Sequence, residues 1–97
     1  MNQFFEELGE LWVLAAAERG AEIRRPSIDA AVALELLELA RVAAHTRERR
    51  FAPLSCYLAG VAAERLRNAN PLLGDAEIAA YILEVRQRLP VAPSSEE

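Results

Sequence analysis

The sequence predicts an all-α protein, a compact bundle of about four helices. Ala and Leu, both strong helix formers, supply 19 and 14 of the 97 residues, against six Val, four Ile and one Thr. Apolar residues also recur at helical spacing in four segments that Gly and Pro separate. The length fits one domain, which we expect over residues 1–90, with a disordered tail over residues 91–97.

The first helix is predicted over residues 3–19. Asn2 can cap its first turn, and Gly20 can occupy the left-handed position that ends it. Gly9 lies inside this segment, where glycine weakens a helix, so we expect a neighbouring backbone to approach there. One helical stripe is formed by Phe4, Phe5, Leu8, Leu11, Trp12, Ala15 and Ala16.

The second helix is predicted over residues 28–46, with Ser27 as its N-cap. Its polar stripe is narrow, so we expect a central helix that is covered on most sides. The third helix is predicted over residues 53–69, with Pro53 at its first position. The fourth is predicted over residues 76–89, with Asp75 as its cap.

The second and third helices carry more apolar surface than the other two can cover. This surplus predicts that a second copy, giving a homodimer, or another protein closes part of the surface. The alternative is a compact bundle that buries both helices by itself. The expected interface residues are Leu37, Ala44, Tyr57, Leu58 and Val61.

Charge and composition exclude several classes of protein. The net charge of −4 disfavours nucleic-acid binding, which depends on neutralising phosphates. No run of 18 uncharged apolar residues exists to cross a membrane, and the N-terminus is acidic, unlike a signal peptide. The lone Cys56 excludes an internal disulfide. We therefore expect a soluble protein of the reducing cytoplasm.

The sequence shows no catalytic, metal or cofactor site. One His and one Cys do not make a zinc centre, and the four glycines are too scattered for a phosphate-binding loop. Nothing in the spacing joins His45 to Cys56 as a base to a nucleophile. We therefore expect a protein that is not an enzyme and needs no cofactor.

The segment over residues 41–50 is the one basic part of an acidic chain, with four arginines against one glutamate and a local charge of +3. One interpretation is structural, because cations stabilise the C-terminal end of a helix. The other is an anion site, because a helix beginning at Pro53 has no side chain to cap its backbone donors. The anion-binding candidates are His45, Arg47, Arg49, Arg50, Leu54 and Ser55.

A motif in the middle of the chain consists of an Ala-His pair ending at His45, then Arg49, then Ala-Pro-Leu-Ser over residues 52–55, then Leu58 and Gly60. This motif resembles a family of small helical domains of unknown function, found mainly in actinobacteria. Members occur alone or fused behind molybdopterin guanylyltransferase domains. This chain departs from the motif at Val42 and Arg50, and we expect residues 64–97 to lie outside the family.

The resemblance implies an accessory role near molybdenum-cofactor handling, without a known reaction. The leading hypothesis is therefore a helical, non-enzymatic interaction module that docks to a protein in molybdenum-cofactor biosynthesis or molybdoenzyme maturation. The alternative is a small anion- or nucleotide-binding domain that uses the Arg-rich bend. His45 either binds a ligand or partner there, or holds the loop by donating to a nearby carbonyl.

Overall fold

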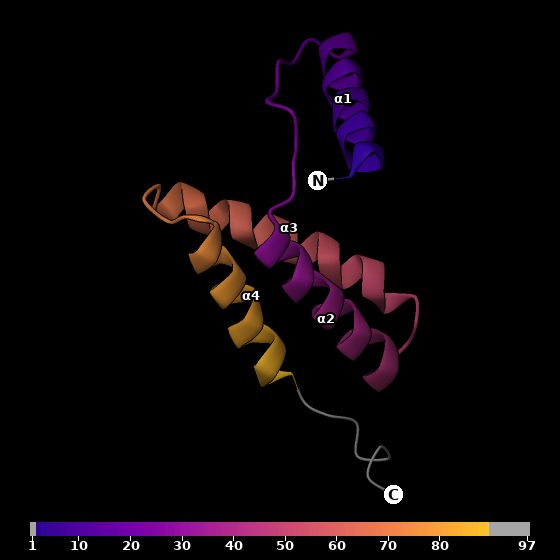
Figure 1. Cartoon of the computed structure of the whole chain (residues 1–97), viewed down its shortest axis with the longest axis vertical. Helices are drawn as coiled ribbons and strands as arrows, with labels where there is room; N and C mark the ends of the chain where they lie inside the picture. Colours follow the sequence, from indigo (N-terminus) through magenta and orange to yellow (C-terminus); the bar gives the residue numbers. More distant parts are fainter. Residues whose placement is uncertain (1, 90–97) are drawn as a thin grey trace, which may run out of the picture. The chain divides into compact units, whose positions relative to one another are not determined.

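The computed structural model describes residues 2–89, and these form four helices without a strand (Figure 1). The helices are α1 (Gln3–Glu18), α2 (Ala30–Thr46), α3 (Phe51–Ala69) and α4 (Asp75–Arg88). The predicted all-α class is confirmed. The chain divides into two compact units, residues 1–30 and 31–97, and the single domain over residues 1–90 stays a prediction. The tail predicted over residues 91–97 lies outside the described residues.

α1 begins at Gln3 as predicted and ends at Glu18, one residue earlier than predicted, and Asn2 and Gly20 have the predicted roles at its two ends. The Asn2 side chain accepts a hydrogen bond of 2.7 Å from the Phe4 N–H. At the other end Gly20 has a φ of +81°, and the Ala21 N–H donates to the Ala16 carbonyl over 2.9 Å. These are the features of a Schellman motif, which occupies carbonyls that the helix leaves without partners.

Gly9 is buried where the connection after α1 passes against the helix. A Cβ at position 9 would lie 2.8 Å from the Pro26 carbonyl oxygen and 2.9 Å from Cγ of Arg25. Arg25 also forms an exposed ion pair with Glu10, at 3.6 Å. The predicted close approach is confirmed, and the approaching backbone belongs to the chain's own connection. A hollow of about 170 Å³ beside it is lined by Phe5, Leu8, Gly9, Trp12, Pro26, Ser27 and Ile28.

α2 begins at Ala30, two residues later than predicted. Ile28 lines the hollow beside α1 and is partly buried, so the connection remains non-helical as far as Asp29. Ser27 lies three residues before the first helical residue and is not the N-cap. Ser27 was therefore a wrong prediction of the N-cap, because the connection lies beside α1 as far as Ile28 and the helix begins only after it.

α3 begins at Phe51, two residues earlier than predicted, and Pro53 is its third residue. Proline is tolerated there because the first N–H groups of a helix have no acceptor within it. The Phe51 and Ala52 N–H groups donate instead to the carbonyls of Glu48 and Arg49, at 3.0 and 3.2 Å. A tight turn therefore precedes the helix.

α4 begins at Asp75, one residue earlier than predicted. Gly74, not Asp75, is the N-cap residue, and its N–H donates to the Glu77 carboxylate at 2.9 Å. Asp75 is the first helical residue, where its negative charge still favours the helix N-terminus.

The core of the unit formed by α2, α3 and α4 is small. Its buried side chains are Leu39 and Ala43 from α2, and Ile78 and Ile82 from α4, of which Ile78 is fully buried. Helix α3 contributes partly buried residues and no fully buried one. The two helices that flank the bend therefore differ in role, since α2 builds the core and α3 covers one side of it.

One polar contact joins each pair of helices in this unit. Glu35 of α2 and Arg86 of α4 form an ion pair of 3.0 Å whose side chains are each only 18% exposed. Arg67 of α3 binds Asp75 of α4 at 2.7 Å. The Cys56 thiol of α3 contacts the Leu36 carbonyl of α2 at 3.6 Å. These contacts fix how the three helices are aligned along their lengths.

α2 is exposed along one stripe and at least partly buried on its other sides, but the exposed stripe includes large apolar side chains. Leu34 and Leu37 are 62% and 67% exposed on its outer face. The surplus of apolar surface on α2 and α3 that the sequence predicts is found in the structure, because large side chains of both helices face solvent. The apolar exposed residues on these two helices are Leu34, Leu37, Phe51, Leu54, Tyr57 and Leu58.

Gly9→Ala and Gly60→Ala form a matched pair of glycine substitutions within helices. At Gly60 a Cβ meets no atom within 4 Å, so alanine should stabilise the protein by about 1 kcal/mol through helix propensity. At Gly9 the backbone oxygen of Pro26 must move, so we expect the connection to detach from α1.

Limited trypsin digestion checks this pair, since Arg24 lies in the connection. Cleavage after Arg24 should accelerate in Gly9→Ala and stay at the native rate in Gly60→Ala. Equal cleavage rates in both variants would contradict the role given to Gly9.

Candidate functional site

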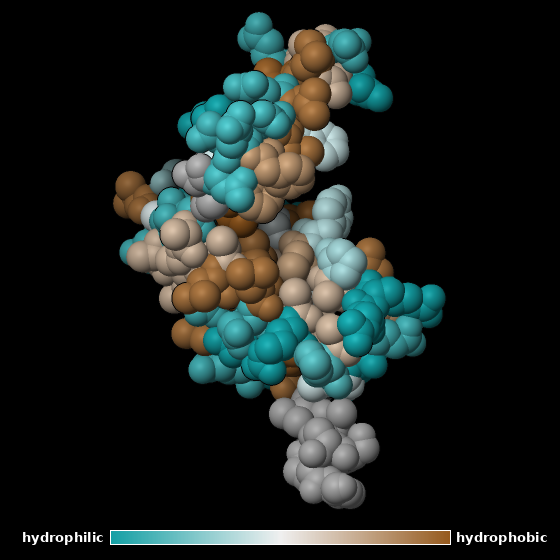
Figure 2. Space-filling view, turned by 45° about the vertical axis from the view of Figure 1, so that its right-hand side comes forward, coloured by the Kyte–Doolittle hydropathy of each residue, from teal (hydrophilic) through white to brown (hydrophobic). Residues whose placement is uncertain are grey.

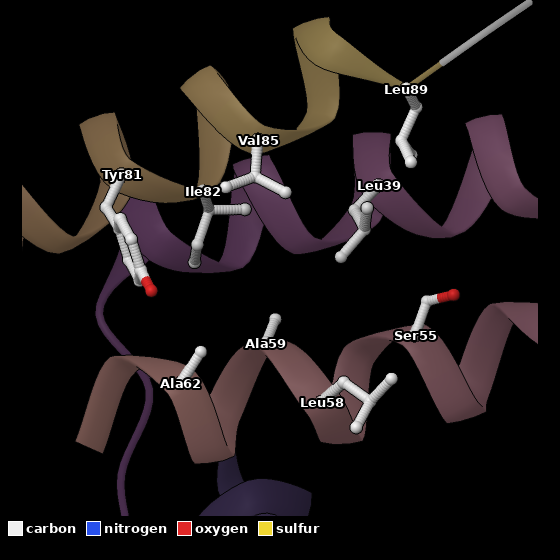
Figure 3. A pocket seen from close by; sticks show the side chains of 9 residues that line it. All are labelled: Leu39, Ser55, Leu58, Ala59, Ala62, Tyr81, Ile82, Val85 and Leu89. Carbon is white, nitrogen blue, oxygen red and sulfur yellow. The ribbon is translucent and has the colours of Figure 1, made fainter. Parts of the chain in front are cut away.

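A groove between α3 and α4 is lined mainly by apolar side chains (Figure 3). Its volume is about 330 Å³, and Leu39 of α2 contributes to its floor. Side chains of α3 and α4 form the two walls. The lining residues are Leu39, Ser55, Leu58, Ala59, Ala62, Tyr81, Ile82, Val85 and Leu89.

The chemistry of this groove is almost wholly apolar. Among its nine lining residues only Ser55 and Tyr81 carry side-chain oxygen atoms, each as a hydroxyl group. The lining holds no carboxylate, imidazole, thiol or cationic group, so it offers two hydrogen bonds and a large apolar contact. Such a lining suits binding an apolar side chain.

Small residues on α3 create the groove. Ala59 and Ala62 point toward α4 in Figure 3, and their short side chains leave the space that larger residues would fill. On the opposite wall Val85 and Leu89 remain 49% and 37% exposed. Figure 2 shows apolar side chains at the surface of this unit with hydrophilic ones beside them. A patch of this kind indicates a binding surface.

A second feature is the outer face of α3, which we call the α3 seam. It consists of Leu54, Tyr57, Val61, Glu64 and Asn68, at alternating spacings of three and four residues. Leu54 and Tyr57 are 61% and 72% exposed. Alternation of three and four is the spacing at which two helices pack side by side. The seam is apolar in its N-terminal half and polar in its C-terminal half.

The five predicted interface residues do not form one patch. Tyr57 and Val61 belong to the α3 seam, whereas Leu58 lines the groove. Leu37 is exposed on α2, and Ala44 is partly buried. The sequence-based prediction missed the α4 wall of the groove. Apolar residues recur at helical spacing along α4, and nothing in that spacing shows that half of the stripe stays open.

The six anion-binding candidates are distributed among three places. His45, Arg47, Arg49 and Arg50 are exposed at the bend, Leu54 lies in the α3 seam, and Ser55 lines the groove. Two of the arginines already have acceptors. Arg47 donates to the Thr46 carbonyl at 2.9 Å, and Nε of Arg50 pairs with Glu48 at 2.6 Å.

The backbone donors on which the anion hypothesis depends also have acceptors. Because α3 begins at Phe51, the Leu54 and Ser55 N–H groups lie beyond the first helical turn and face carbonyls four residues back. The Phe51 and Ala52 donors bond to carbonyls of the bend. The start of α3 therefore lacks the free N–H groups that would hold a phosphate.

Cys56 is partly buried between α2 and α3. Burial raises the pKa of its thiol, because desolvation disfavours the thiolate. A thiol that stays protonated is a poor nucleophile, so the structure favours a packing role for this residue.

Two further classes of site were searched for within residues 2–89. No three residues of the types His, Cys, Asp and Glu lie close enough together there to hold a metal ion. Among the described residues, no helix has the length and apolar character needed to span a membrane.

A protein-family model described as "Domain of unknown function (DUF6457)" matches residues 5–95. The chain belongs to this family. The match includes α4, so the expectation that residues 64–97 lie outside the family is wrong, and the groove is formed entirely by residues of the DUF6457 domain. Searches of curated proteins and of solved structures found no match to the chain.

Cys56 should react slowly with iodoacetamide in the folded protein. The raised thiol pKa leaves less thiolate at neutral pH than the unfolded chain has, and burial restricts access. We expect alkylation at pH 8 to be about tenfold slower or more in buffer than in concentrated urea, where the thiol has its ordinary pKa. The rate in buffer should keep rising at pH values where the rate in urea has levelled off. Equal rates at pH 8 would contradict this.

Arg49→Ala should leave the binding of pyrophosphate, measured as the heat released on titration, the same as in the native protein. The donors at the start of α3 already have acceptors, so Arg49 has no backbone anion site to complete. Calorimetric titration of the native protein and the variant measures this. A binding signal in the native protein that the variant loses would restore the anion hypothesis.

Proposed function

We propose that this DUF6457 protein is a non-enzymatic interaction module that docks an apolar helix of a partner protein in the α3–α4 groove. We further propose that it acts in the cytoplasm, in molybdenum-cofactor biosynthesis or molybdoenzyme maturation. The observation that carries the docking proposal is the open apolar groove, in which Leu58 is 66% and Val85 is 49% exposed.

A helix is the partner element that best suits this groove. Two roughly facing helix walls with a floor between them form the kind of cleft that receives an amphipathic helix, whose apolar side chains lie at every third or fourth position. Complete burial of a Leu or Val side chain contributes about 1.5–3 kcal/mol. Covering the exposed parts of Leu58, Val85 and Leu89 would therefore contribute roughly 1 kcal/mol each.

The molybdenum part of the proposal is supported by the resemblance of the motif from His45 to Gly60. The resemblance implies that relatives with this motif occur fused behind molybdopterin guanylyltransferase domains. In a fusion the linker holds the two domains together at high effective concentration. When the two domains are separate chains, a docking surface is needed to bring them together. The groove would provide that surface.

The alternative function, binding of an anion or nucleotide at the bend, has less support. It requires free backbone donors at the start of α3, and those donors have acceptors within the chain. The groove in contrast has a lining of apolar side chains that suits a partner helix.

The test uses purified molybdopterin guanylyltransferase from the organism that encodes this chain. Calorimetric titration should show binding to the native protein. Val85→Glu places a charge on the wall of the groove and should weaken this binding by about tenfold or more. Leu34→Glu is the matched control, because it also replaces an exposed apolar residue on a helix, but outside the groove.

Equal affinity of the native protein and both variants would contradict docking in the groove. A second experiment captures partner proteins from the same organism with the native protein and with Val85→Glu. The proposed function as a whole would be contradicted if the guanylyltransferase does not bind and both proteins capture the same partners.

A further inference from the structure

The α3 seam has a symmetry that the groove lacks. Its five residues lie around Val61, with Leu54 and Asn68 seven residues before and after it, Tyr57 four residues before it and Glu64 three residues after it. A second α3 helix running antiparallel, with a two-fold axis at Val61, would therefore bring like positions of the seam together. Val61 would meet the partner's Val61, Leu54 would lie level with the partner's Asn68, and Tyr57 would lie within one residue of the level of the partner's Glu64.

We propose that a second copy of this chain binds along the α3 seam, with the two α3 helices antiparallel about a two-fold axis at Val61. This goes beyond the proposed function, because the seam and the groove are different faces of α3. The resulting homodimer would leave both grooves open for partner helices.

The first support is the match of chemical groups across the axis. The phenol of Tyr57 is 72% exposed, and Glu64 is also exposed. A phenol O–H that donates to a carboxylate forms a charge-assisted hydrogen bond, and the two-fold axis would produce this bond twice. Leu54 would meet the aliphatic part and amide of the partner's Asn68.

The second support is charge. Arg47 and Asp75 stand fourteen residues before and after Val61, so the axis brings the bend of each copy to the start of the partner's α4. The bend carries exposed arginines, and the start of α4 carries Asp75 and Glu77. A parallel arrangement would place each basic bend against the other, which like charges oppose.

The third support is area. Leu54, Tyr57 and Leu72, which follows the seam in the turn before α4, are 61%, 72% and 94% exposed. Together they leave roughly 400 Å² of side-chain surface in contact with water, since a large side chain presents about 150–250 Å². A standard interface covers about 800 Å² on each partner. These three residues would thus supply about half of the buried area that a stable dimer needs. The flanks of α3 and the bend would supply the rest of that area.

Static light scattering of the native protein over a wide concentration range is the first test. We expect twice the chain mass of 10.7 kDa at high concentration. Tyr57→Glu sets a carboxylate against the partner's Glu64 and should raise the dimer Kd by about tenfold or more. Leu34→Glu is the control, because Leu34 is 62% exposed on α2 and outside the seam, and it should keep the native mass.

Disulfide trapping decides the orientation, in a Cys56→Ser background that removes the native thiol. Val61→Cys should form a covalent dimer rapidly on mild oxidation, because the axis places the two thiols together. Leu54→Cys should not cross-link to itself, but it should cross-link to Asn68→Cys in a mixture of the two proteins. Rapid self-cross-linking of Leu54→Cys would indicate parallel helices and overturn the proposed arrangement.

A native protein that remains monomeric at high micromolar concentration would overturn the second-copy proposal. Its failure is distinguishable from that of the proposed function, since a monomer that still binds the guanylyltransferase contradicts the dimer alone. A dimer that does not bind it contradicts only the docking role.

Discussion

The packing of α4 against α3 and α2 is the interaction on which the rest of the unit depends. Leu39 and Ala43 of α2 and Ile78 and Ile82 of α4 are the buried hydrophobic residues of the described chain. Helix α3 packs against α4 but contributes no buried residue to this core, so it is not enclosed by the rest of the unit. Both candidate binding surfaces follow from this, since an enclosed α3 would expose neither the groove nor the seam.

The Glu35–Arg86 ion pair adds specificity to that contact. Apolar side chains tolerate sliding of one helix along another, whereas two charges that are each 18% exposed are stable only when they meet. The main effect of the pair is therefore to fix the position of α4 along α2, and its contribution to the free energy of folding is small. That alignment sets where Val85 and Leu89 stand over the groove.

Helix positions were largely predictable because apolar spacing and terminal residues such as Asn2 and Gly20 act locally. The first residues of α2 and α3 were not predictable from the sequence, because each depends on a contact outside the helix. Ile28 lies against α1 before α2 begins, and a tight turn ends at Phe51 where α3 begins. The same limit applies to the site. The sequence identified exposed residues of α3, but their division between groove and seam depends on the packing of α4.

The close approach at Gly9 constrains how this sequence can change over evolutionary time. The residues on the exposed face of α1 can vary as long as they favour a helix, because solvent accepts any side chain. Position 9 has no such freedom, since the obstacle is the carbonyl oxygen of Pro26, which every residue at position 26 would also present. No compensating substitution in the connection can make room, so a lineage that loses this glycine must also reroute the backbone between its first two helices.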